Sequence, residues 1–214
     1  MTRIVAIGEC MVEMAPVATE GQFRLGYAGD TLNTAWYLRR LLGASDQIDY
    51  FTAVGTDAVS DKMIDFLQQA GIGTTRILRR DDKGVGLYMI QLQDGERSFC
   101  YWRSDSAARS LAADPVPLQA ALDNADLAYF SGITLAILPP ADRTRLLTAL
   151  RRFRSCGGIV VFDPNLRPKL WASPDEMTQT VMQAAAGSDI ALASYADEAH
   201  WFGGDSPEGT LKRY

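Results

Sequence analysis

The chain has 214 residues, a length that allows one domain with a sizeable core, or one domain plus a small appendage. Hydrophobic residues make up 47% and charged residues 22%, which is an ordinary composition for a soluble globular protein. The formal net charge is -5 and no basic run is longer than two residues, which argues against nucleic acid and anionic membranes as partners. An acidic protein of this kind must bind an anion with a few placed arginines.

Cysteine and histidine usage narrows the chemistry further. Cys10, Cys100 and Cys156 are far apart and odd in number, so they form neither a metal-binding spacing nor a disulfide framework. The first ten residues hold too short an apolar run for a signal peptide, and no stretch approaches a membrane span. We therefore expect a cytoplasmic protein. The single histidine, His200, argues against histidine triads and multi-histidine zinc sites, and we predict no metal ligand.

Apolar β-branched runs alternate with amphipathic stretches along the chain. Strands are predicted at 3–9, 48–55, 127–132, 158–163 and 189–194, with two short ones near 12–15 and 23–27. Helices are predicted at about 31–42, 59–70, 140–154 and 173–185. This alternation predicts an α/β fold with a mainly parallel sheet flanked by helices, in one domain over residues 1–214.

Polar residues crowd the start of the helix predicted at about 31–42. Asp30 or Thr31 can cap this helix, but Asn33 lies just inside it, where its amide has no capping role. A helix N-terminus also presents free N–H groups and the positive end of the helix dipole. With Gly29, Asp30 and Asn33 around it, this helix start is predicted to hold a small polyhydroxy ligand.

Residues 86–103 contain Asp94-Gly95 between two extended runs, which predicts a two-residue β-hairpin. Pairing across that turn sets Tyr88 opposite Tyr101. Because side chains alternate along a strand, Tyr88, Tyr101 and Arg103 then share one face, and Trp102 lies on the other. Two phenols and a guanidinium on one face suit stacking on, and hydrogen bonding to, a sugar acid.

Several segments together resemble the 2-keto-3-deoxygluconate kinases, which belong to the ribokinase family of carbohydrate kinases. The most specific are GDTLNTA (29–35), YWR (101–103), SGITLAIL (131–138) and FDPNLRPKLW (162–171), and they occur in the family's order. The matching stretches cover nearly the whole chain. The resemblance implies a ribokinase-like α/β fold with a small β lid, formed by the hairpin at about 86–103 and the strands at about 12–27.

The resemblance also implies a set of sugar-acid-binding residues. In these kinases the GDTLN segment binds sugar hydroxyls and the hairpin closes over the sugar. Arg103 would meet the substrate carboxylate through a charge-assisted contact. The implied substrate-binding residues are Gly29, Asp30, Thr31, Leu32, Asn33, Tyr88, Tyr101, Trp102 and Arg103.

On the phosphate side, Asn165 and Arg167 match the family's Asn-x-Arg, near the path of the transferred phosphate. Ser194 matches a nucleotide-side position more weakly. The implied nucleotide-binding residues are Asn165, Leu166, Arg167 and Ser194, and Arg167 is the implied charge stabiliser. The implied reaction uses ATP and Mg²⁺ and yields 2-keto-3-deoxy-6-phosphogluconate. Family members often form homo-oligomers through the lid, and the number of subunits stays open.

The catalytic base of this family is the aspartate of a Gly-Ala-Gly-Asp motif, which these 214 residues do not contain. The FGGDS segment (202–206) looks similar but is followed by no apolar helix, so we interpret it as a surface turn. We name no base in this chain. We expect a C-terminally incomplete kinase that is inactive alone because the base motif is absent. We also expect it to be poorly soluble, because its last predicted strand lacks its expected neighbours.

Three acidic residues have two readings each. Asp163 either caps the loop after its strand or lies near nucleotide or metal. Glu198 resembles a family position near magnesium and the phosphates, yet glutamates are also common on helix surfaces. Glu9 follows the first strand, where a place in the sugar pocket and a structural role fit equally.

Two other functions stay open. One is kinase activity on a neutral ketose such as fructose. The other is a noncatalytic protein that binds a sugar acid without ATP. Nucleotide-binding oxidoreductases fit poorly because no G-x-G-x-x-G follows the first strand, and the absence of G-x-x-x-x-G-K excludes a P-loop kinase.

Overall fold

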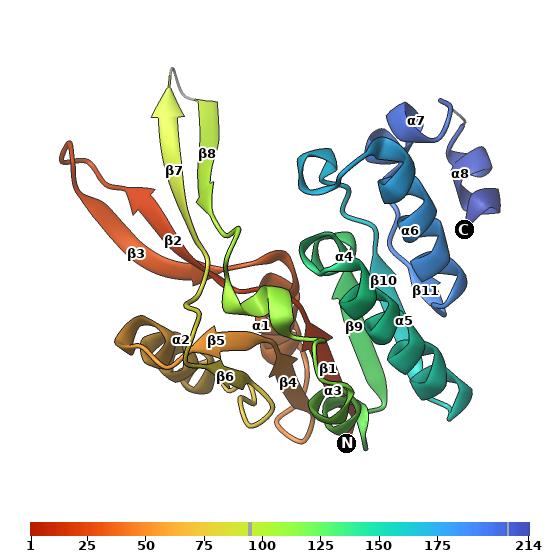
Figure 1. The fold of residues 1–214 in the computed structure, drawn as a ribbon, viewed down its shortest axis with the longest axis horizontal. Coiled ribbons are helices and arrows are strands. Elements are labelled where there is room, and N and C mark those ends of the chain that lie inside the picture. The colour runs from red at the N-terminus through yellow and green to blue at the C-terminus, as the bar shows by residue number, and fades with distance from the viewer. Residues whose placement is uncertain (94–95, 205) are drawn as a thin grey trace.

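A five-stranded parallel sheet forms the centre of the protein (Figure 1). The structure is a computed structural model that describes residues 1–93, 96–204 and 206–214. The strands are β1 (Arg3–Ile7), β4 (Gln47–Phe51), β9 (Leu127–Ser131), β10 (Ile159–Asp163) and β11 (Ile190–Ala191), in the order β11-β10-β9-β1-β4. Every neighbouring pair is parallel, which confirms the predicted fold class.

Alternate side chains of the central strands enter two hydrophobic clusters, one on each face of the sheet. In β1, Val5 and Ile7 belong to the first cluster, whereas Ile4 and Ala6 belong to the second. The first cluster includes side chains of α3 (Pro115–Leu122), α4 (Gly132–Ile137), α5 (Pro140–Ser155) and α6 (Pro174–Ala186). The second includes side chains of α1 (Asp30–Leu41) and α2 (Ala58–Gln69). Both faces are therefore packed, as a parallel sheet requires.

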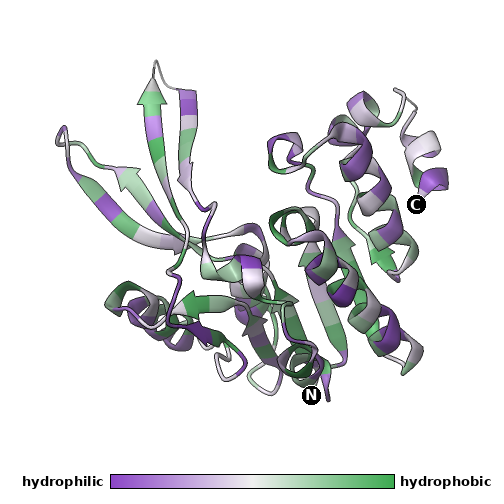
Figure 2. Cartoon of the chain, viewed as in Figure 1, coloured by the Kyte–Doolittle hydropathy of each residue, from purple (hydrophilic) through white to green (hydrophobic). Residues whose placement is uncertain are grey.

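A second sheet of four strands projects from the central one, and we call it the lid sheet (Figure 1). It contains β2 (Met11–Pro16), β3 (Phe23–Ala28), β7 (Leu87–Gln93) and β8 (Glu96–Trp102), in the order β3-β2-β7-β8. Tyr88 pairs with Tyr101, as the sequence predicts. The predicted Asp94-Gly95 turn lies outside the described residues. Figure 2 shows polar and apolar residues mixed along these strands, unlike the apolar strands of the central sheet.

Two predicted strands differ from those observed. The run at 48–55 divides at Thr52, and its second part, β5 (Ala53–Gly55), leaves the central sheet to pair with β6 (Leu78–Arg80). The run at 189–194 keeps only the two residues of β11, because α7 (Tyr195–Trp201) begins shortly afterwards. Propensity marks where a chain can be extended, but pairing decides which part forms a strand.

The expected side-chain cap of α1 is also wrong. Helix α1 begins at Asp30 with Gly29 as its N-cap, and no side chain caps it. The Asp30 carboxylate instead accepts a hydrogen bond from Asn165, and the Thr31 hydroxyl contacts Tyr50. Both polar groups are therefore used for tertiary contacts.

Short helical segments complete the chain and lie below the length that periodicity detects. Helix α3 starts at Pro115 behind an Asp114 cap, and the six residues of α4 follow a capping box at Ser131. The others are the 3₁₀ turns at Ala107–Ser110 and Pro168–Leu170, and α8 (Pro207–Arg213). Within the described ranges, no helix combines the length and apolar character needed to cross a membrane.

Two leucines on helices of equal length test this account of the core. Leu67 in α2 is fully buried, whereas Leu41 in α1 is 79% exposed. We expect Leu67→Ala to lower the free energy of unfolding by about 2–5 kcal/mol. Leu41→Ala should change it by less than about 0.5 kcal/mol, which urea denaturation can measure. Equal losses in the two variants would contradict the assignment of the second cluster.

Candidate functional site

A cavity of about 780 Å³ opens where the central sheet meets the lid sheet. Residues following β1 and β10 and the start of α1 form one part of its wall, and β7 and β8 form another. Ligands of open α/β sheets bind beyond the carboxyl ends of the strands, which is where this cavity lies. Its lining residues are Glu9, Met11, Ala28, Gly29, Asp30, Asn33, Tyr88, Phe99, Tyr101, Arg103, Ile133, Asn165, Arg167, Pro168, Lys169 and Leu170.

Most of the residues implied by the resemblance meet in this cavity. On the sugar side these are Gly29, Asp30, Asn33, Tyr88, Tyr101 and Arg103, and on the phosphate side Asn165 and Arg167. They come from α1, the lid sheet and the segment after β10, so segments more than 130 residues apart in sequence supply one wall, as the Asp30–Asn165 contact shows. Their roles toward a ligand remain predictions.

Five of the implied residues do not line the cavity. Thr31 and Leu32 are buried, with Thr31 bound to the Tyr50 hydroxyl at 2.8 Å. Leu166 is also buried in the core. Trp102 is 55% exposed and alternates with Tyr101 and Arg103, which places it on the opposite face of β8. Ser194 is an exposed residue that precedes α7. These side chains lie outside the cavity wall in this structure, and their roles toward a ligand also remain predictions.

Helix α1 begins against the segment that follows β1. A Cβ atom at position 29 would collide with the Glu9 carbonyl oxygen, so only glycine allows this close approach. The next residue, Asp30, accepts a hydrogen bond from the Asn165 side-chain amide at 2.9 Å. This bond joins the helix start to the loop after β10. One turn later, Asn33 is exposed in the cavity.

Three aromatic rings form the part of the wall contributed by the lid sheet. The Tyr88 and Tyr101 rings lie 5.8 Å apart, and the Phe99 ring lies 6.0 Å from Tyr88. The Tyr88 hydroxyl donates a hydrogen bond to the Glu13 carboxylate on β2. Burial raises the pKa of Tyr88, and the adjacent Glu13 raises it further, so the phenol stays neutral. The hydrogen bond to Glu13 therefore holds the Tyr88 ring in place within the lid sheet.

Glu9 and Arg103 form a buried ion pair beside the cavity. The Arg103 Nη2 atom donates to Glu9 Oε2, and the Ser106 hydroxyl donates to Glu9 Oε1. The side chain of Glu9 is 1% exposed and that of Arg103 is 11% exposed. Burial raises the pKa of the Glu9 carboxyl, and Arg103 and Ser106 oppose that rise. Both interpretations of Glu9 therefore apply, since it lines the cavity and also links the end of β1 to the segment that follows β8.

The remaining charges make the cavity wall slightly cationic. Its acidic residues are Glu9 and Asp30, and its basic residues are Arg103, Arg167 and Lys169. Glu9 is paired with Arg103, whereas Arg167 and Lys169 form no ion pair within the described part of the chain. Among the described residues, the Arg167 guanidinium donates to the Leu166 carbonyl at 2.7 Å, and its charge opposes the rise in the pKa of Asp163. An anionic ligand would thus meet two cations that no ion pair neutralises.

Asp163 shapes the loop that carries the phosphate-side residues. Its Oδ1 accepts a hydrogen bond from the Asn165 backbone N–H at 3.0 Å, and its Oδ2 is 3.4 Å from the Tyr129 hydroxyl. Burial raises the pKa of Asp163, and the nearby Asp30 carboxylate adds to that rise. Asn165 has φ 34°, in the left-handed region that asparagine tolerates better than most residues. The hydrogen bond from the Asn165 backbone therefore supports the interpretation of Asp163 as a loop cap.

Glu198 and the FGGDS segment lie outside the cavity wall. Glu198 is fully buried, and the Tyr214 hydroxyl donates to its Oε1 at 2.7 Å. In the FGGDS segment, Gly203 and Gly204 have positive φ and belong to a turn, whereas Asp205 lies outside the described residues. Over the described ranges, no group of three or more acidic, histidine or cysteine side chains could hold a metal ion.

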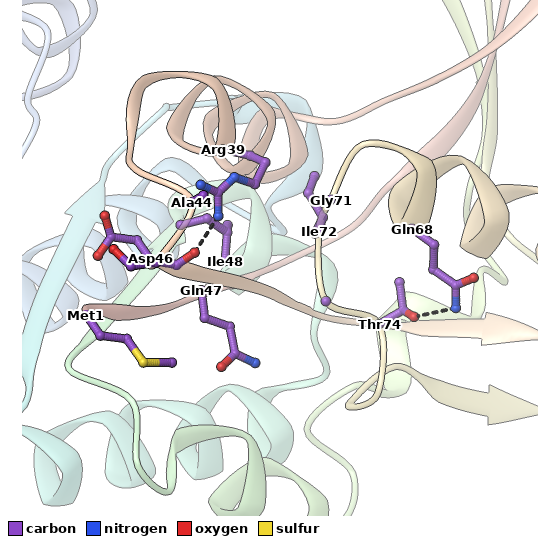
Figure 3. A pocket seen from close by; sticks show the side chains of 12 residues that line it. Met1, Arg39, Ala44, Asp46, Gln47, Ile48, Gln68, Gly71, Ile72 and Thr74 are labelled. Atoms are coloured by element: carbon purple, nitrogen blue, oxygen red, sulfur yellow. Dashed lines mark hydrogen bonds between the residues drawn. The ribbon is translucent and has the colours of Figure 1, made fainter.

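A second hollow, of about 480 Å³, lies at the opposite end of the central sheet (Figure 3). It includes Asp46 and Gln47, where β4 begins. Arg39 donates to the Asp46 carbonyl, and Gln68 donates to the Thr74 hydroxyl at 2.9 Å. These polar groups satisfy one another at the amino ends of the strands. This hollow is therefore a poorer ligand site than the cavity below the lid sheet.

Sequence reasoning missed some of the cavity wall. Phe99 could have been found, because strand alternation places it on the face of Tyr101. Lys169 follows Arg167 by two residues, and its charge was a usable signal in an acidic chain. Ile133 lies within the SGITLAIL segment, but the motif did not place it in the wall, because that place depends on how α4 packs.

Comparison with known proteins gives the family. Residues 1–214 match the pfkB family carbohydrate kinase. The 2-dehydro-3-deoxygluconokinase of Haemophilus influenzae is 41% identical over 100% of this chain and 69% of its own length. The enzyme of the same name from Dickeya dadantii is 44% identical over 98% of this chain and 68% of its own length.

Similarity to solved structures extends over the same region. The crystal structure of a PfkB protein from Polaromonas sp. JS666 superposes with a TM-score of 0.87 and 25% identity, covering 100% of this chain and 72% of that one. The chain therefore belongs to the pfkB family of carbohydrate kinases.

Proposed function

We propose that this chain contains the sugar-acid site of an ATP-dependent 2-keto-3-deoxygluconate kinase. The observation that carries the proposal is the composition of one cavity wall, in which hydroxyl-binding groups on α1 face a cationic, aromatic wall on the lid sheet. The 41–44% identity to 2-dehydro-3-deoxygluconokinases supports the same substrate, since that name denotes the same sugar acid.

The start of α1 suits the polyhydroxy end of such a substrate. The Asp30 carboxylate accepts hydrogen bonds, and the Asn33 amide can both donate and accept them. Asn33 N–H bonds to the Gly29 carbonyl, whereas the N–H groups of the preceding helix residues have no partner within the helix. These groups match sugar hydroxyls, which donate and accept equally well. Asp30 keeps this capacity because its partner, Asn165, is neutral.

The acid end is assigned to Arg103. Its Nη2 is held by Glu9, whereas neither Nε nor Nη1 has a hydrogen-bond partner among the described residues, which leaves guanidinium donors for a carboxylate. Hydrogen bonds between ionised groups are shorter and about twice as strong as those between neutral groups. The tyrosine rings beside Arg103 would cover the apolar face of the sugar.

The phosphate side is assigned to Asn165 and Arg167, which line the cavity beyond the sugar groups. Arg167 would stabilise the charge that develops on the transferring phosphoryl group. Mg²⁺ is usually bound through one or two carboxylates plus nucleotide phosphates, so a cage of protein ligands is not required. It would supply charge neutralisation between the phosphates. Asp30, Asn33 and Arg103 are assigned to orienting the acceptor sugar.

Replacing Arg103 separates acid recognition from sugar recognition. We expect Arg103→Ala to raise the dissociation constant for 2-keto-3-deoxygluconate by roughly 10- to 150-fold, the loss of a hydrogen bond to a charged group. Binding of the neutral sugar fructose should change by less than about threefold, because its hydroxyls use other groups. Isothermal titration calorimetry with both sugars on one preparation measures this. Equal losses for both sugars would contradict the assignment.

Turnover is a separate test. The 214 residues contain no Gly-Ala-Gly-Asp segment, so we propose that they bind the sugar acid without transferring phosphate. A coupled assay of ADP release with 2-keto-3-deoxygluconate should give the rate of the enzyme-free blank, in a preparation that binds the sugar by calorimetry. Release well above the blank would show that a residue in this chain serves as the base.

A further inference from the structure

The carboxylate of Glu9 lies where the lid sheet joins the core. Glu9 itself follows β1, whereas its two hydrogen-bond donors, Arg103 and Ser106, both follow β8. The strand that enters the lid sheet passes the same point, since a Cβ atom at Gly86 would lie 2.9 Å from Glu9 Oε1 and 3.2 Å from Arg103 Cβ. Three separate segments therefore meet around one buried carboxylate.

Backbone hydrogen bonds hold the same junction together. Val12 N–H donates to the Gly86 carbonyl at 2.8 Å, and Ala107 N–H donates to the Gly84 carbonyl at 2.8 Å. These bonds set the path of the backbone but leave the long Arg103 side chain undetermined. The Glu9 carboxylate supplies a constraint, because a charge-assisted bond at Nη2 restricts where the guanidinium can lie.

We propose that Glu9 is a positioning residue that holds the Arg103 guanidinium in the orientation that binds the substrate carboxylate. The inference rests on the proposed function for the identity of the substrate. It assigns Glu9 no contact with the reacting atoms. Glu9 makes its charge-assisted bond to Nη2 of an arginine in the cavity wall, so acid recognition depends on a residue that follows the core strand β1.

Electrostatic potential and positioning predict opposite effects of neutralising Glu9. A buried anion next to Arg103 also reduces the positive potential that the substrate carboxylate meets. If potential alone governed binding, neutralising Glu9 would tighten the binding of the acid. If positioning governs binding, the same change weakens it.

A double-mutant cycle with Glu9→Gln and Arg103→Ala decides between these outcomes. Glutamine keeps the size of Glu9 and removes its charge. We expect Glu9→Gln to raise the dissociation constant for 2-keto-3-deoxygluconate about tenfold, the difference between charged and neutral hydrogen bonds. Fructose binding should change less than about twofold, and the glutamine should have no further effect in the Arg103→Ala background.

Glu176→Gln is the matched control. Glu176 forms an ion pair with Arg143, with 2.7 Å between nitrogen and oxygen, and neither residue lines the cavity. It should leave the binding of both sugars unchanged. Tighter or unchanged acid binding in Glu9→Gln, equal losses for both sugars, or a full tenfold effect in the absence of Arg103 would overturn the proposal.

A second measurement does not depend on the ligand. We expect amide hydrogen exchange over residues 100–106 to accelerate in Glu9→Gln and in Arg103→Ala to the same extent, with no further acceleration in the double variant. Unchanged exchange in Glu9→Gln would overturn the proposal. If the unmodified protein binds no 2-keto-3-deoxygluconate, the proposed function fails, and the exchange data alone then decide whether Glu9 holds Arg103.

Discussion

A buried ion pair joins the two parts of this fold. Glu9 extends from the end of the central strand β1, and Arg103 follows the last strand of the lid sheet. A charge buried without its partner is strongly destabilising, so these two segments are constrained to stay together. The same pair lies in the wall of the cavity. The Glu9–Arg103 ion pair that joins the lid sheet to the core therefore also places the Arg103 cation in the cavity wall.

Parallel pairing accounts for the rest of the cavity. Because β1, β9 and β10 run in the same direction, their carboxyl ends meet at one edge. The segments that leave this edge therefore bring Glu9, Ile133 and Asn165 together from distant parts of the sequence. The bond between Asp30 and Asn165 then links the start of α1 to the loop after β10. Side chains from distant segments are thus held together in one cavity wall.

Much of this arrangement could be predicted from the sequence. The Asp94-Gly95 turn signal predicted the pairing of Tyr88 with Tyr101, and apolar runs located the central strands, because both signals are local in the sequence. Tertiary choices could not be read in this way. The capping potential of Asp30 was overridden by Asn165, and Trp102 matched a motif although it lies on the other face of β8. The role of Glu9 stayed open because its partners are more than 90 residues away.

The most direct test of this account is a crystal structure of the protein with 2-keto-3-deoxygluconate bound. The account predicts the sugar carboxylate within hydrogen-bonding distance of the Arg103 guanidinium, with the Glu9 contact at Nη2 retained and sugar hydroxyls at Asp30 and Asn33. A carboxylate bound instead by Arg167 and Lys169, with Arg103 directed only to Glu9, would contradict it.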